Sequence, residues 1–158
     1  MICIPHGGIG YEDCLSMARK EAFVEFRFDL LSLSLDQVKE VVTAASSCIV
    51  TCRPGKMKEA DRKEVLKTGI LSGADYVDIE VESDRAFINE VNKTARAHDT
   101  AIIISYHNFE GTPSIGVLEQ IVNDCRELGA DVVKIASQVN QAEDLQTLFK
   151  LYRPDLRM

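Results

Sequence analysis

The sequence predicts an α/β protein of the (β/α)8 TIM-barrel type, with about six of the eight βα units present. Short apolar runs alternate with segments of helical periodicity along the chain, which favours right-handed βαβ units and a parallel sheet. Several consecutive strands also carry polar side chains on one face. A barrel lets such faces converge at its interior and mouth, whereas an open sheet would have to bury them under helices.

Six runs of mostly apolar residues predict the strands. They are Ile2–Pro5, Phe23–Leu30, Cys48–Arg53, Tyr76–Val81, Ala101–His107 and Val132–Ser137. Successive side chains of a strand point to opposite faces. Glu25, Arg27 and Asp29 are therefore expected to share one face, and Asp78 and Glu80 to share the corresponding face of a later strand.

The segments between these runs have the helical period. They are Tyr11–Glu21, Leu35–Ala45, Ala60–Ser72, Asp84–His98, Ser114–Leu128 and Gln141–Tyr152. We expect Ser34 or Asp36 to cap the second helix. Gly73 and Gly129 should end the third and the fifth, because glycine accepts the left-handed backbone of a helix end. Pro154 should stop the last.

The length of 158 residues predicts one domain, here a single incomplete barrel domain over residues 1–158. A complete barrel has eight units and about 250 residues, and a seventh strand would begin where residues 152–158 stand. Missing units would leave two strand edges unpaired. We therefore expect a homo-oligomer, such as a dimer, because open edges favour self-association.

Composition narrows the function classes. A formal net charge of −7 argues against a general binder of nucleic acid or of anionic membranes. No apolar run approaches a membrane span, and no signal peptide is visible. The five cysteines are odd in number and lack CxxC spacing, so reduced apolar thiols in a cytoplasmic protein are expected. Neither GxGxxG nor a P-loop follows a strand, which disfavours nucleotide cofactors.

Two residues at the last predicted strands suggest catalysis. Lys134 lies within the apolar run 131–137, where a charged amine is costly and a neutral amine can attack a carbonyl. His107 ends the preceding strand, at the barrel end where active sites form, and histidine suits proton transfer near neutral pH. The alternatives are a lysine that reaches solvent and a hydrogen-bonded structural histidine.

Arginines near the earlier strands suggest an anionic or polyol substrate. Arg27 lies within the predicted strand 23–30, and Arg53 ends the predicted strand 48–53. Guanidinium groups bind carboxylates through two parallel hydrogen bonds. Glu25 is expected to reach the substrate region with them, while Asp29 orients its neighbours. A buried ladder of ion pairs and a solvated Arg53 are the alternatives. Either Asp78 or Glu80 would balance these cations or orient His107.

Taken together, five segments resemble the type I 3-dehydroquinate dehydratase family. In the family's order they are VEFRFD at 24–29, TCR at 51–53, YVDIE at 76–80, SYHNF at 105–109 with Thr112-Pro113, and VKIA at 133–136. The resemblance implies a β/α barrel that dehydrates 3-dehydroquinate to 3-dehydroshikimate in the shikimate pathway. It also implies that neither a metal nor a cofactor is used.

Residue by residue, the resemblance implies that Lys134 forms an imine with the substrate ketone. His107 would remove the C2 proton and then protonate the departing C1 hydroxyl. Glu25, Arg27 and Arg53 would hold the hydroxyl and carboxylate groups of the substrate. The chemistry agrees, because a protonated imine withdraws electrons and acidifies the adjacent C–H bond.

The chain departs from the family in two respects. Many members carry a glutamate that orients the histidine, four residues after the arginine matched by Arg53, and this chain has Met57 there. Members also continue through two further units, which supply a carboxylate-binding arginine and a covering loop. A truncated barrel fragment of weak or no activity, folded as an oligomer, is therefore the alternative. An aldolase-like Schiff-base enzyme fits the motifs less well.

Overall fold

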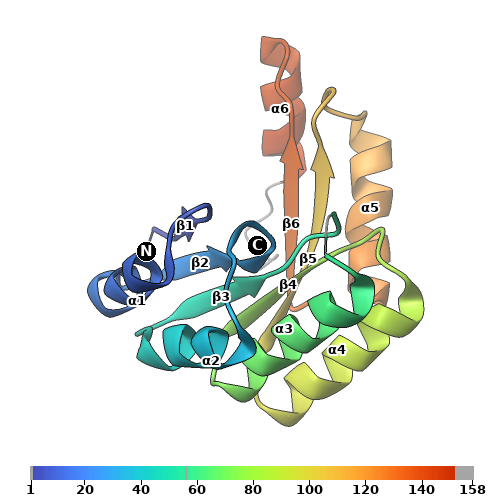
Figure 1. Cartoon of the computed structure of the whole chain (residues 1–158). Coiled ribbons are helices and arrows are strands. Elements are labelled where there is room, and N and C mark those ends of the chain that lie inside the picture. Colours follow the sequence, from blue (N-terminus) through green and yellow to red (C-terminus); the bar gives the residue numbers. More distant parts are fainter. Residues whose placement is uncertain (1, 56, 152–158) are drawn as a thin grey trace. The chain divides into compact units, whose positions relative to one another are not determined.

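The computed structural model describes residues 2–55 and 57–151, in which strands and helices alternate (Figure 1). The strands are β1 (Ile4–His6), β2 (Val24–Arg27), β3 (Cys48–Thr51), β4 (Tyr76–Glu80), β5 (Ala101–Asn108) and β6 (Val132–Ser137). The helices are α1 (Tyr11–Lys20), α2 (Leu35–Ala44), α3 (Glu59–Leu71), α4 (Arg85–Ala97), α5 (Ile115–Glu127) and α6 (Ala142–Leu151). The predicted α/β alternation is confirmed.

The strands follow chain order in one sheet, β1-β2-β3-β4-β5-β6, and β1–β2, β2–β3, β3–β4 and β5–β6 pair in parallel. The chain divides into two compact units. The first holds β1 to β3, most of β4, and α1 to α4. The second holds Glu80–Glu82, most of β5, and α5, β6 and α6. One domain over residues 1–158 stays a prediction.

In the first unit the helices cover one face of the strands. Each of α1 to α3 packs against the next helix along the chain, α1 also contacts β2, and α3 contacts β3 (Figure 1). Phe26, Val50 and Val77 lie side by side in register and are fully buried. At Gly69 of α3 a Cβ atom would lie 2.7 Å from Val50 Cγ2, so the absence of a side chain lets α3 approach β3 closely.

Local signals set several helix ends as predicted. Ser34, rather than Asp36, caps α2: Gln37 N–H donates to Ser34 Oγ, and Ser34 N–H donates to Gln37 Oε1 at 2.9 Å. This reciprocal pair is a capping box. Gly73 and Gly129 follow α3 and α5 with φ of +92° and +90°, as expected of glycine at a helix end. Tyr152 and Pro154 lie outside the described residues.

Two strand predictions extended too far. Residues 28–30 form a 3-10 turn rather than the end of β2, and Leu31 N–H bonds to the Phe28 carbonyl within it. β3 ends at Thr51, because the Cys52 carbonyl accepts Arg62 Nε of α3 instead of continuing a strand ladder. Residues 29 and 53 therefore follow the strands and do not belong to the strand faces.

Candidate active site

The first unit carries a polar face opposite its helix-covered face. Arg27 of β2 pairs in register with Thr51 of β3, which pairs with Asp78 of β4. Residues in register on parallel strands point to the same side of the sheet. Thr51 and Asp78 are both fully buried, so this face carries buried polar groups, as the alternation in the sequence predicted.

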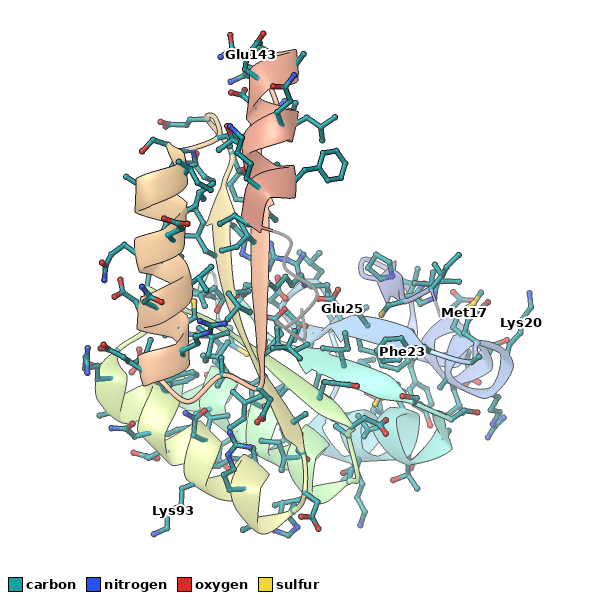
Figure 2. The ribbon with its side chains drawn as sticks, turned by 180° about the vertical axis from the view of Figure 1, so that it is seen from behind. Met17, Lys20, Phe23, Glu25, Lys93 and Glu143 are labelled. Carbon is teal, nitrogen blue, oxygen red and sulfur yellow. The ribbon has the colours of Figure 1, made fainter. Side chains whose placement is uncertain are left out.

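Glu25 occupies the position before Arg27 on this face. Its carboxylate is 8% exposed and accepts a hydrogen bond from Thr51 Oγ1, with 2.8 Å between the oxygens. Figure 2 labels Glu25 on the ribbon of β2. Burying a carboxylate costs free energy unless hydrogen bonds or opposite charges compensate. The hydrogen bond from Thr51 provides part of this compensation on the polar face.

The 3-10 turn after β2 brings the Asp29 carboxylate next to the Arg27 guanidinium. Arg27 Nε lies 2.9 Å from Asp29 Oδ1, and Arg27 Nη2 lies 2.7 Å from Oδ2. Burial raises the pKa of Asp29, but hydrogen bonds from Arg27 and from the Arg53 backbone N–H hold it below its ordinary value. Asp29 thus pairs with a neighbouring residue through a fork, which fits both the expected orienting role and the alternative of a buried ladder of ion pairs.

Arg53 lies just after β3, beside a surface hollow of about 460 Å³. Asp29, Pro54 and Gly55 line the same hollow. Arg62 of α3 holds the preceding residue, since its Nε donates to the Cys52 carbonyl at 2.7 Å. Arg62 is only 3% exposed, although its charged neighbours in the sequence are typical of a solvated helix face.

In the second unit, β5 and β6 bring the two proposed catalytic residues together. Ser105 pairs with Lys134, and His107 pairs with Ala136. Lys134 and His107 therefore share a face on adjacent strands, one pleat apart. Strand geometry separates their Cα atoms by about 8 Å, a distance that a lysine side chain and a bound substrate can span. Both side chains are half-buried.

Contacts after β5 fix the surroundings of His107. Its ring stacks on that of Phe109, with 6.3 Å between centroids and 14° between planes. The Asn108 side-chain oxygen accepts the N–H groups of Glu110 and Gly111 at 2.9 and 3.2 Å. The turn that follows His107 is thus closed by the side chain of its neighbour.

The loop after β5 is bound to the loop after β6. Thr112 Oγ1 donates to the Gln138 carbonyl at 3.0 Å and lies 3.0 Å from Ser137 Oγ. Asn140 Nδ2 donates to the Glu110 carbonyl at 2.9 Å. These bonds join the two loops that follow the strands of His107 and Lys134.

Metal ligands, thiols and apolar helices can each be located in the part of the chain that the structure describes. There, no group of three or more His, Cys, Asp or Glu side chains could hold a metal ion. Burial raises the pKa of Cys48 and of Cys125 to about 12, which keeps both thiols protonated and unreactive. No helix in that part is long and apolar enough to cross a membrane.

The sequence matches a family model and curated relatives of the same description. The family model described as type I 3-dehydroquinase matches residues 11–154. The 3-dehydroquinate dehydratase of Methanococcus maripaludis strain C7 is 35% identical, over 96% of this chain and 73% of the relative. That of Methanosarcina barkeri is 33% identical, over 89% of this chain and 66% of the relative.

Solved structures show the same fold. The type I 3-dehydroquinate dehydratase of Clostridium difficile superposes with a TM-score of 0.83 at 23% identity, over 94% of this chain and 67% of that one. The 3-dehydroquinate dehydratase of Aquifex aeolicus superposes with a TM-score of 0.80 at 27% identity, over 96% and 73%. By its sequence match and its fold, this chain belongs to the type I 3-dehydroquinase family.

Proposed function

We propose that this chain is a 3-dehydroquinate dehydratase, a hydro-lyase that converts 3-dehydroquinate to 3-dehydroshikimate in the shikimate pathway through a Schiff base on Lys134. Family membership supports the reaction. The observation that carries the proposal is the register of β5 and β6, since Lys134 and His107 share a face one pleat apart. A nucleophilic amine and a proton carrier on one face suit an imine-dependent elimination.

In the proposed reaction, Lys134 Nζ adds to the substrate ketone, and loss of water from the adduct leaves a protonated imine. His107 removes the C2 proton, and the electrons of the C–H bond move toward the imine nitrogen to form an enamine. The enamine then expels the C1 hydroxyl, which leaves as water with the proton carried by His107. Hydrolysis of the imine releases the product and restores the amine.

Glu25, Arg27 and Arg53 are proposed to bind the hydroxyl and carboxylate groups of the substrate. The fork between Arg27 and Asp29 supports this role for Arg27, because a guanidinium held in one orientation loses less entropy when it binds an anion. The Arg62 bond to the Cys52 carbonyl supports a fixed position for Arg53 in the same way.

We further propose a (β/α)8 TIM-barrel type of architecture with about six of the eight units, a homo-oligomer as the assembly and the cytoplasm as the location. The superposition on the type I 3-dehydroquinate dehydratase of Clostridium difficile, with a TM-score of 0.83 over 67% of that chain, supports this type of fold for the units present. Leu145 and Phe149 of α6 are 46% and 69% exposed, and such apolar side chains favour self-association. Reduced cysteines in the described residues support a reducing compartment. A strictly monomeric mass in concentrated solution would contradict the oligomer.

Borohydride trapping tests the function. The protein is incubated with 3-dehydroquinate and reduced, and its intact mass and modified peptide are measured. We expect an adduct on Lys134 that disappears in Lys134→Ala and persists in the control Lys93→Ala, a change at an exposed residue of α4 (Figure 2). If the folded wild-type protein gives no adduct, or if Lys134→Ala retains it, the proposal is wrong.

A further inference from the structure

Glu80, the last residue of β4, is a buried carboxylate in the second unit. It is 7% exposed, although burying a carboxylate costs free energy unless a nearby charge or hydrogen bonds compensate. The family resemblance assigned it no role. The strand register gives its neighbours across the sheet.

Backbone pairing places Glu80 beside Ser105. Val81 N–H donates to the Ser105 carbonyl at 2.9 Å. In a parallel ladder, the residue before such a donor lies level with the residue whose carbonyl accepts the bond. Glu80 and Ser105 are therefore neighbours across the sheet and point to the same side.

Lys134 completes this row. It pairs with Ser105 on the other side, so Glu80 and Lys134 flank Ser105 on one face. Two strand spacings separate the outer Cα atoms by about 10 Å, and extended glutamate and lysine side chains together span this distance. Ser105 is fully buried, and its short side chain reaches less far from the sheet than the two that flank it.

Other titratable groups lie one pleat from this row: on β4, the buried carboxylate of Asp78 precedes Glu80 by two residues and shares its face. On this face of the second unit, the titratable side chains of the described strand residues are Glu80, His107 and Lys134. His107 lies one pleat beyond Ser105 on β5 and does not separate Glu80 from Lys134. Glu80 is thus the carboxylate of this unit that is level with the proposed nucleophile.

We propose that Glu80 is the counter-ion of Lys134, both as the ammonium group and as the protonated imine. The imine part rests on the proposed function. The carboxylate favours the positive form of the imine, which is the form that accepts electrons when His107 removes a proton. Glu80 transfers no proton in this role. It positions Nζ and balances its charge through the reaction.

The first experiment needs no substrate. Lys134 acetylation by acetic anhydride is followed by peptide mass spectrometry as a function of pH, since the neutral amine alone reacts. Removing an opposite charge favours the neutral amine, so Glu80→Gln should lower the midpoint of the curve by about one pH unit or more. The matched control Glu82→Gln, at an exposed residue of the same unit, should leave it unchanged. An unchanged midpoint in Glu80→Gln overturns the proposal.

A reciprocal measurement covers the case in which Glu80→Gln fails to fold. Coupling between two charges is mutual, so Lys134→Gln should raise the pH at which the Glu80 carboxyl titrates, followed by carbon-13 NMR of labelled glutamate. A higher midpoint supports the pair. The same midpoint in both proteins overturns it.

Trapping with 3-dehydroquinate and cyanoborohydride, which reduces protonated imines, separates the inference from the function. If wild type forms the adduct, its yield should fall as the pH rises and the imine loses its proton. In Glu80→Gln this fall should occur at a lower pH than in wild type. Equal pH dependence overturns the counter-ion role of Glu80 while the dehydratase proposal stands. If folded wild type forms no adduct, the dehydratase proposal fails, and the acetylation curves alone decide the pairing of Glu80 with Lys134.

Discussion

Arg27 and Asp29 are joined by two parallel hydrogen bonds, Nε to Oδ1 at 2.9 Å and Nη2 to Oδ2 at 2.7 Å. The fork exists because the chain leaves β2 in a 3-10 turn and returns the carboxylate to the guanidinium two residues earlier. One partner is a proposed substrate ligand and the other is not. A change at Asp29 therefore tests the contribution of the ion pair to stability without removing the proposed ligand itself.

Asp29→Asn should lower the free energy of unfolding at pH 7 by about 1–2 kcal/mol, because a charge-assisted fork is lost. The folded-state pKa of Asp29 is lowered from 3.8, so its contribution is present above pH 3.8 and is lost as the pH falls through the folded-state value. Urea unfolding at pH 7 and pH 3 measures this. Asp99→Asn, at an exposed residue with φ of 55°, is the control. An equal loss at both pH values would contradict the ion pair.

Arg62→Lys should lower the free energy of unfolding by about 2–4 kcal/mol, because a buried, hydrogen-bonded guanidinium loses its partners. Arg62 donates to the Cys52 carbonyl at 2.7 Å and lies 4.4 Å from the centroid of the Phe87 ring. KM should rise, since Cys52 directly precedes Arg53. Arg85→Lys on the exposed start of α4 should change stability by less than about 0.5 kcal/mol. Denaturant unfolding and steady-state kinetics distinguish the two variants.

Gly69→Ala should destabilise the protein although alanine favours helices. The new methyl group would lie 2.7 and 2.8 Å from the two Cγ atoms of Val50, and overpacking of this kind costs about 1–3 kcal/mol. Gly116→Ala in α5 meets nothing within 4 Å, and should be neutral or stabilising by up to about 1 kcal/mol. Thermal unfolding compares them. Restored stability in Gly69→Ala with Val50→Ala would assign the cost to this contact.

His107→Ala should retain the imine and lose elimination, because Lys134 forms the covalent bond and His107 moves the protons. Turnover should fall by about 10²–10⁴-fold, the range for a positioned acid or base. Borohydride trapping reports the imine, and ultraviolet absorbance of the conjugated product reports elimination. His98→Ala, at the exposed end of α4, is the control. Full turnover in His107→Ala would remove the histidine from the mechanism.

Local signals in the sequence predicted the elements well. Ser34 and Gln37 form their capping box within one turn of α2. Gly73 ends α3 through its own positive φ angle. Each helix end is therefore determined by a few neighbouring residues, which the sequence shows directly. The end of β2 was missed because Phe28 continues the apolar alternation. It is 2% exposed in the 3-10 turn, and the burial of an aromatic side chain does not distinguish a turn from a strand.

Pairings between distant segments account for what was missed at the site. Arg62 stands in the charged stretch Asp61-Arg62-Lys63-Glu64, which is typical of a solvated helix face. It is buried because the end of β3 and Phe87 of α4 surround it. Strand alternation placed Lys134 and His107 near one end of adjacent strands, but the row through Ser105 depends on strand register, which alternation alone does not give.

The hydrogen bonds between the loops after β5 and β6 couple the hydrogen exchange of their backbone amides. Gln138 N–H donates to the Asn108 carbonyl at 2.8 Å, and the Gln138 carbonyl accepts from Thr112. One loop cannot open without breaking bonds to the other, so the amides of both should exchange hydrogen as one cooperative segment. Thr112→Val would then speed deuterium uptake in residues of both loops together, including those beside His107.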